Sequence, residues 1–217
     1  MSASSEPIPR LHILLGADRL SGEALAGSAR LYGTGHPVAL HLRARVSAAR
    51  LFRAAERLAD ASGRGWCVVN GRPDIALAAG AHAVQLGHAS LSVRDVRSLA
   101  AGRDLRVGAS VHEPEEAVAA ARDGADFLVV GTMYPTPSHP GRAGRGPDGM
   151  ARVAAAVSAA GHPGVPLLAI GGVDAGRIEP LIDAGAYGVV VGRAVWETPD
   201  PEAAAARLAA ALAAAGR

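Results

Sequence analysis

The sequence predicts a single (β/α)₈ TIM barrel, and three observations carry that prediction. Short apolar runs alternate with longer segments of helical spacing, eight times along the chain. The runs are continuously apolar, which is typical of parallel strands covered on both faces. Three helical segments end in a glycine just before the next run, at Gly80, Gly124 and Gly185, where a helix end favours a left-handed residue. An open, doubly wound sheet is the alternative architecture that this alternation leaves open.

Each expected strand is an apolar run of four or five residues, a common strand length. In chain order the strands are Leu11–Leu15, Val38–Leu42, Trp66–Val69, Ala83–Leu86, Arg106–Ala109, Phe127–Val130, Leu167–Ile170 and Gly188–Val191.

Each expected helix follows one of these strands. Leu51, Ala54, Ala55 and Leu58 show the helical spacing most clearly, and Pro114 lies near a first turn, where proline is tolerated. In chain order the helices are Ser21–Leu31, Ser47–Ala61, Asp74–Ala79, Val93–Ala100, Glu113–Arg122, Pro147–Ala160, Ala175–Ala184 and Glu202–Ala215.

Length and composition favour one domain with a sizeable core. The chain has 217 residues, of which 49% are hydrophobic and 19% charged. No composition break divides it, so we expect a short N-terminal tail over residues 1–10 and one barrel domain over residues 11–217. The long irregular stretch is Thr132–Gly146, rich in Pro, Gly and Ser, and loops of that length are often functional.

Charge and cysteine content exclude several classes of partner. The net charge is +2, and the arginines are scattered among acids rather than clustered with aromatic residues, so we expect no nucleic-acid partner. No run of about 18 apolar residues lacks charges, so we expect no membrane span. Cys67 is the one cysteine, which favours a reducing, cytoplasmic location. A homo-oligomer is compatible with this composition, but nothing in the sequence requires one.

Glycine turns follow the last two expected strands. Gly171 and Gly172 end the seventh strand, and Gly192 and Arg193 end the eighth. Barrels often bind phosphate at these two loops, where backbone N–H groups can approach the ligand. The alternative for Gly171 and Gly172 is a tight turn with no ligand. We therefore predict that a small phosphate ester binds here.

The second strand carries three cationic or protonatable groups. Alternation directs His41, Arg43 and Arg45 to one side, toward the mouth of the barrel. Such a set is costly without an anionic partner. The partner is a ligand anion or, alternatively, an acid such as Asp18 at a neighbouring strand end.

Other polar residues lie at the ends of the third to sixth strands. Three histidines are candidates for proton transfer, because imidazole titrates near neutrality; these are His41, His112 and His139. His12 begins the first strand, and we assign it no role. Arg72 either contacts a ligand or pairs with Asp74. The remaining candidates for ligand contact are Asn70, Ser110, Thr132, Thr136 and Ser138. Few acids lie at the mouth, so we predict no metal site and no cofactor.

Read in order, these segments resemble the thiamine phosphate synthase/TenI superfamily. The resemblance extends from about residue 11 to about residue 197. The matching phrases are HLRAR (41–45), VVNGRPDIAL (68–77), AVQLGHASLS (83–92), VGASVHEPEEAVAAARDGADFLVVG (107–131), YPTPSHPG (134–141) and LLAIGGV (167–173).

The superfamily has two branches, and the resemblance implies a different chemistry for each. Synthases join a pyrimidine diphosphate to thiazole phosphate with Mg²⁺, whereas TenI-type proteins include tautomerases that move a proton to aromatise the thiazole phosphate. Gly71 and Ser90 stand where the synthase pattern has metal-binding aspartates, and His139 stands where it has a diphosphate-binding lysine. In the synthase pattern a Gln-x-Arg-x-Lys phrase corresponds to His41-Leu42-Arg43-Ala44-Arg45. Thr132 stands where tautomerases have a catalytic histidine.

The resemblance therefore implies a TenI-type protein that binds a thiazole phosphate and, if catalytic, transfers a proton without a metal. Gly172, Gly192 and Arg193 would hold the phosphate, and Arg43 and Arg45 would face a second anionic group. One alternative is a thiamine phosphate synthase with a degenerate Mg²⁺ site. Another is a non-catalytic protein that binds a phosphate ligand or regulates the pathway.

Overall fold

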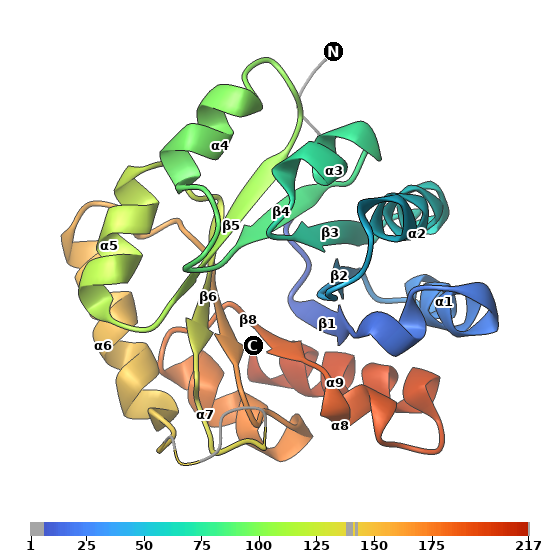
Figure 1. The fold of residues 1–217 in the computed structure, drawn as a ribbon. Helices are drawn as coiled ribbons and strands as arrows, with labels where there is room; N and C mark the ends of the chain where they lie inside the picture. Colours follow the sequence, from blue (N-terminus) through green and yellow to red (C-terminus); the bar gives the residue numbers. More distant parts are fainter. Residues whose placement is uncertain (1–6, 138–140, 142, 217) are drawn as a thin grey trace.

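The computed structural model describes residues 7–137, 141 and 143–216, which form one closed barrel of eight parallel strands in the order β1 to β8. Figure 1 shows the helices surrounding the strands. The predicted (β/α)₈ barrel is therefore confirmed, and the open sheet is excluded. The strands are β1 Leu11–Leu15, β2 Val38–Leu42, β3 Trp66–Asn70, β4 Ala83–Leu86, β5 Arg106–Val111, β6 Phe127–Gly131, β7 Leu167–Ile170 and β8 Gly188–Val191.

The helices lie outside the barrel. The α-helices are α1 Gly22–Ala29, α2 Ala48–Ala61, α3 Pro73–Ala78, α4 Val93–Leu99, α5 Pro114–Arg122, α6 Gly146–Ala159, α7 Ile178–Asp183, α8 Arg193–Trp196 and α9 Pro201–Ala215. The sequence did not predict α8, because four residues are too few to show helical spacing. Within the described ranges, no helix has the length and the apolar character needed to cross a bilayer.

Strand alternation divides the core into two regions. Outward-facing residues such as Ile13 and Leu40 pack against the helices. Inward-facing residues fill the lumen of the barrel, which includes Trp66, Phe127 and Leu168. His12 and His41 lie on the inward face of β1 and β2 and are also fully buried. Two imidazoles thus lie inside an otherwise mainly apolar lumen.

Gly188 allows β8 to close the barrel against β1. A Cβ on Gly188 would lie only 2.1 Å from the carbonyl oxygen of Arg10, which accepts a hydrogen bond from the backbone N–H of Val189. The carbonyl oxygen of Arg10 and the nitrogen of Val189 are backbone atoms, so neither can move away without breaking the hydrogen bond that helps to close the barrel.

We therefore expect Gly188→Ala to lower the free energy of unfolding by about 2 kcal/mol or more, as overpacking does in a rigid core. Denaturant unfolding measures this change. Gly164→Ala is the matched control, because a Cβ there would meet no atom within 4 Å, and it should change stability by less than about 0.5 kcal/mol. Equal stability of the two variants would contradict this account of closure.

Candidate functional site

The turns after β7 and β8 have the backbone geometry expected of a phosphate site. Gly171 and Gly172 have φ angles of 102° and 63°, in the region that favours glycine. Gly192 is the N-cap of α8, and its carbonyl oxygen accepts from the backbone N–H groups of Val195 and Trp196. The N–H groups of Arg193 and Ala194 precede these first hydrogen bonds of the helix. The structure thus places both predicted glycine turns at the C-terminal mouth of the barrel.

The loop after β6 packs directly on these turns. A Cβ on Gly172 would lie 2.9 Å from the Cβ of Tyr134 and 3.0 Å from the carbonyl oxygen of Pro135. The Arg193 guanidinium donates to the hydroxyl of Thr136 over 3.1 Å. Gly172, Thr136 and Arg193, which are distant in sequence, therefore meet at one side of the mouth.

Sequence reasoning missed Arg177, whose side chain contacts and stabilises the turn after β7. Its guanidinium donates to the carbonyl oxygen of Gly172 over 2.5 Å and lies 4.7 Å from the ring centroid of Tyr134. Arg177 follows the glycines by only five residues, but its contacts depend on the β6 loop, which local sequence cannot place.

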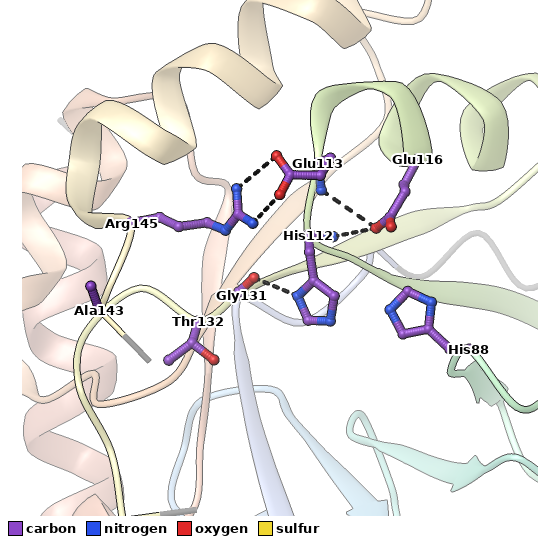
Figure 2. A pocket seen from close by; sticks show the side chains of 8 residues that line it. All are labelled: His88, His112, Glu113, Glu116, Gly131, Thr132, Ala143 and Arg145. Carbon is purple, nitrogen blue, oxygen red and sulfur yellow. Dashed lines mark hydrogen bonds and ion pairs between the residues drawn. The ribbon is translucent and has the colours of Figure 1, made fainter. Parts of the chain in front are cut away.

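A second part of the mouth forms an open pocket of about 510 Å³ at the ends of β4, β5 and β6, drawn in Figure 2. That volume lies within the range of small-molecule sites. Eight residues line it, namely His88, His112, Glu113, Glu116, Gly131, Thr132, Ala143 and Arg145. The rings of His88 and His112 stack with centroids 5.0 Å apart. Sequence reasoning gave His88 no role, because its stacking partner comes from another strand.

His112 is held in one tautomer by the backbone. Its Nδ1 lies 2.6 Å from the carbonyl oxygen of Gly131, and since a carbonyl only accepts, Nδ1 carries the proton. In neutral His112, Nε2 is then an acceptor, and no described residue donates to it. His112 is therefore arranged as a general base would be.

Two carboxylates stabilise the loop that carries His112. Burial raises the pKa of Glu116, but the backbone N–H groups of His112 and Glu113 donate to its carboxylate, and the net pKa is lowered. The Arg145 guanidinium holds the Glu113 carboxylate through both of its oxygens and lowers the pKa of Glu113. Figure 2 shows this pair at the edge of the pocket. Both acids are thus ionised near neutral pH and occupied by protein donors.

The sequence predicted that His41, Arg43 and Arg45 would all point into the mouth, but the structure places them differently. His41 lies in the lumen with 1% of its surface exposed, and β2 ends at Leu42. Arg43 and Arg45 follow in the loop, where both are exposed. The strand alternation that grouped the three residues stops before the arginines. Neither arginine pairs with a described acid, and the acid proposed as their alternative partner, Asp18, lies 3.8 Å from Arg19.

The polar residues at the ends of β3 to β5 contact one another. Arg72 pairs with Asp74 at 2.6 Å, which favours the second of its two expected roles. The Gln85 amide nitrogen donates to the Ser110 hydroxyl over 2.9 Å. Asn70 lies beside Gln85 in the β3–β4 register. Asn70 on β3 and Ser110 on β5 thus lie on either side of Gln85 on β4, at the floor of the mouth.

Three further candidates belong to the β6 loop. Thr132 lines the pocket beside Gly131 and is nearly buried. Ser138 and His139 lie outside the described residues, so the role expected for His139 stays a prediction.

The residues present do not fit the Mg²⁺ site that the resemblance implies for a synthase. A Cβ on Gly71 would lie 3.6 Å from the Ser90 hydroxyl oxygen, so the two positions do face each other. They supply no carboxylate, and the Ser90 oxygen accepts from the backbone N–H of Gly87 over 3.0 Å. Among the described residues, no three His, Cys, Asp or Glu side chains are grouped as metal ligands. Mg²⁺ binds oxygen ligands, with carboxylates preferred among side chains.

A closed barrel of eight parallel strands with alternating helices defines the class of (β/α)₈ barrels, in which active sites form at the C-terminal mouth. The family model described as thiamine monophosphate synthase matches residues 20–195. The chain belongs to this family, the thiamine phosphate synthase/TenI superfamily.

Individual relatives agree with this assignment. The chain is 45% identical over 164 residues to a protein of Mycobacterium bovis named thiamine-phosphate synthase, which covers 75% of this chain and 72% of the relative. A protein of Thermus thermophilus with the same name is 41% identical over 140 residues, 64% of each chain. The solved thiamine phosphate pyrophosphorylase of Pyrococcus furiosus superposes with a TM-score of 0.80 at 24% identity, over 95% of this chain and 96% of that one, which shows a shared fold.

Proposed function

We propose that this chain binds thiazole phosphate at the β7–β8 side of the mouth and joins it to a pyrimidine diphosphate, as a thiamine phosphate synthase with a degenerate metal site. The observation that supports the ligand is that the β6 loop joins the two glycine turns: Gly172 packs against Tyr134 and Pro135, and Arg193, next to Gly192, donates to Thr136. The names of the relatives favour the joining reaction over the TenI-type tautomerase that the sequence suggested.

The joining reaction forms a carbon–nitrogen bond to the thiazole ring and releases diphosphate. Charge develops on the departing diphosphate, and fixed cations stabilise such charge. Arg43 and Arg45 are exposed at the end of β2 with no described acid paired to them. We infer that these two guanidinium groups, rather than metal-binding carboxylates, face the leaving group.

An assay with pyrimidine diphosphate, thiazole phosphate and either Mg²⁺ or a chelator tests this proposal. We expect coupled product whose rate depends only weakly on Mg²⁺. The Gly71→Asp/Ser90→Asp double variant should increase that dependence, because it restores both carboxylates and Asp tolerates a positive φ better than most residues. Absence of coupled product between about pH 6 and pH 9, in the range where imidazole titrates, would remove the synthase proposal.

A second candidate function is proton transfer on a thiazole phosphate without a metal, and the tautomer of His112 favours it. A positioned base of this kind contributes a rate factor of about 10² to 10⁴. His41 is a weaker candidate for the base, because both of its ring nitrogens contact protein groups.

We expect His112→Gln to slow exchange of deuterium into thiazole phosphate by about 10²-fold or more, if this second function operates. Exchange is measured by NMR of the ligand. His36→Gln is the control, since His36 is exposed and lies outside the pocket. Unchanged exchange in His112→Gln would exclude His112 as the base. Tight binding with neither exchange nor coupling would favour the non-catalytic alternative.

A further inference from the structure

A row of hydrogen-bonding side chains crosses the barrel lumen from its N-terminal end to its mouth. The Nε2 atom of His12 lies 2.8 Å from the carbonyl oxygen of Pro9, and its Nδ1 lies 2.7 Å from Nε2 of His41. Nδ1 of His41 lies 3.3 Å from Oδ1 of Asn70, at the end of β3. Both imidazoles are at least 99% buried, and the ring of Phe127 packs edge-on to His12.

The direction of each hydrogen bond follows from the Pro9 end. The Pro9 carbonyl only accepts, so Nε2 of His12 carries a proton. Burial lowers the pKa of His12 well below its usual value and lowers the pKa of His41 to about 4, so both rings are neutral near pH 7. Nδ1 of neutral His12 is then an acceptor, and Nε2 of His41 must be the donor. Nδ1 of His41 is left as an acceptor.

Two acceptors, Nδ1 of His41 and Oδ1 of Asn70, cannot share a hydrogen bond, so the Asn70 amide must be turned over to present its N–H₂ group to His41. The nitrogen and oxygen of an amide exchange places by a half-turn of the side chain, with almost no change in shape. Among the described residues, His41 is the one hydrogen-bond partner of this amide. With the nitrogen turned inward, the carbonyl oxygen of Asn70 faces the ligand side.

We propose that His12 and His41 are positioning residues that fix the Asn70 amide with its carbonyl oxygen toward the mouth, and that the β3–β4 side of the site therefore receives a ligand group with an N–H donor. The inference rests on the proposed function only in taking the mouth as the ligand site.

Gln85 is the inward-facing neighbour of Asn70 on β4. It pairs with Asn70 in the β3–β4 register, and only 3% of its surface is exposed. Its amide nitrogen donates to Ser110, whereas its Oε1 has no donor among the described residues. That oxygen is closed to solvent and lies over Gly108, where a Cβ would be 2.5 Å from it, so it faces the lumen and not the mouth. The acceptor that this side of the mouth offers a ligand is therefore the Asn70 carbonyl oxygen, which favours a neutral amino group over a phosphate.

NMR of protein labelled with ¹⁵N at histidine tests the positioning directly and without ligand. At about pH 7, well above the lowered pKa values, we expect His12 and His41 each to show one protonated nitrogen, Nε2, and one unprotonated nitrogen, Nδ1. A proton on Nδ1 of either ring, or a doubly protonated ring, would overturn the proposal.

Two substitutions of His12 separate positioning from packing. His12→Leu removes the acceptor for His41, so we expect the single-tautomer pattern of His41 to be lost. His12→Asn places an amide oxygen near the former Nδ1 and should restore that pattern. Failure of His12→Asn to restore the pattern, or retention of the pattern in a folded His12→Leu protein, would contradict the positioning role of His12. Far-ultraviolet circular dichroism reports folding, and if His12→Leu does not fold, the wild-type tautomers and His12→Asn still decide the question.

The ligand preference is tested with two probes, an aminopyrimidine and the same ring with the amino group replaced by methyl. We expect the amino compound to bind about tenfold more tightly, the difference that one hydrogen bond of roughly 1.4 kcal/mol makes. The preference should vanish in His12→Leu and persist in His12→Asn. Equal affinity of the two probes for the wild-type protein would refute the subsite. Calorimetry with thiazole phosphate on the same samples reports separately on the proposed function.

Discussion

Acidification from about pH 7 to about pH 4 should lower the free energy of unfolding by about 3 kcal/mol through His41 alone. Burial holds the pKa of His41 at about 4 in the folded chain, against an ordinary value of 6.5. The unfolded chain therefore binds more protons across this interval, and stability rises with pH. The contribution is complete above the unfolded pKa and is lost as the pH falls toward the folded one. His12, whose pKa is also lowered, adds to the same effect.

Denaturant unfolding at a series of pH values measures this loss. Asp74, Glu113 and Glu116 also have lowered pKa values, but their contributions disappear only near and below their ordinary values of 3.8 and 4.5. The interval between about pH 6.5 and pH 4.5 therefore reports mainly the histidines. We expect His41→Gln to reduce the slope in this interval and the exposed control His36→Gln to keep it. If the stability of the wild-type protein does not change across the interval, the conclusion that His12 and His41 are buried in the neutral form is wrong.

Replacement of Gly172 by alanine should weaken the binding of thiazole phosphate by tenfold or more. A residue with a Cβ is strained by about 1 kcal/mol or more at the φ of 63° found there. The new Cβ would also lie 2.9 Å from the Cβ of Tyr134 and 3.0 Å from the Pro135 carbonyl. The turn must then move, and its N–H groups lose their approach to the phosphate. Titration calorimetry measures the affinity.

Gly176→Ala is the matched control for Gly172→Ala. It lies in the same connection after β7, its φ is not positive, and its nearest new neighbour would be an Asp174 carboxylate oxygen 3.6 Å away. We expect its affinity for thiazole phosphate to equal that of the wild-type protein. If Gly172→Ala folds and binds as tightly as Gly176→Ala, the β7 turn is not the phosphate site.

Most of the fold could be predicted from the sequence because parallel strands covered on both faces are continuously apolar. The errors lie where that signal ends. Strand β5 continues to Val111, two residues beyond its predicted end, through the polar Ser110. Helix α8 was missed because it has a single turn, although its glycine N-cap was identified as a ligand residue.

In the candidate site, too, the sequence pointed to residues with a local signal and missed residues that depend on neighbours from other strands. The glycine turns were predicted because their function depends on local backbone conformation and on their place in a barrel. His12 was given no role, because its significance depends on register: His12 pairs with Ala39, which brings its ring beside His41 from the next strand. His88 and Arg177 were missed for the same reason, since each acts through a neighbour from another loop. Local sequence predicts which residues end a strand, but not which side chains meet above it.

A crystal structure of the chain with bound thiazole phosphate tests the central claim most directly. We predict phosphate oxygens within hydrogen-bond distance of backbone N–H groups in the Gly171–Gly172 turn and at the start of α8, and the thiazole ring directed toward His112. A phosphate bound instead at Arg43 and Arg45, or a ligand outside the mouth of the barrel, would contradict the account.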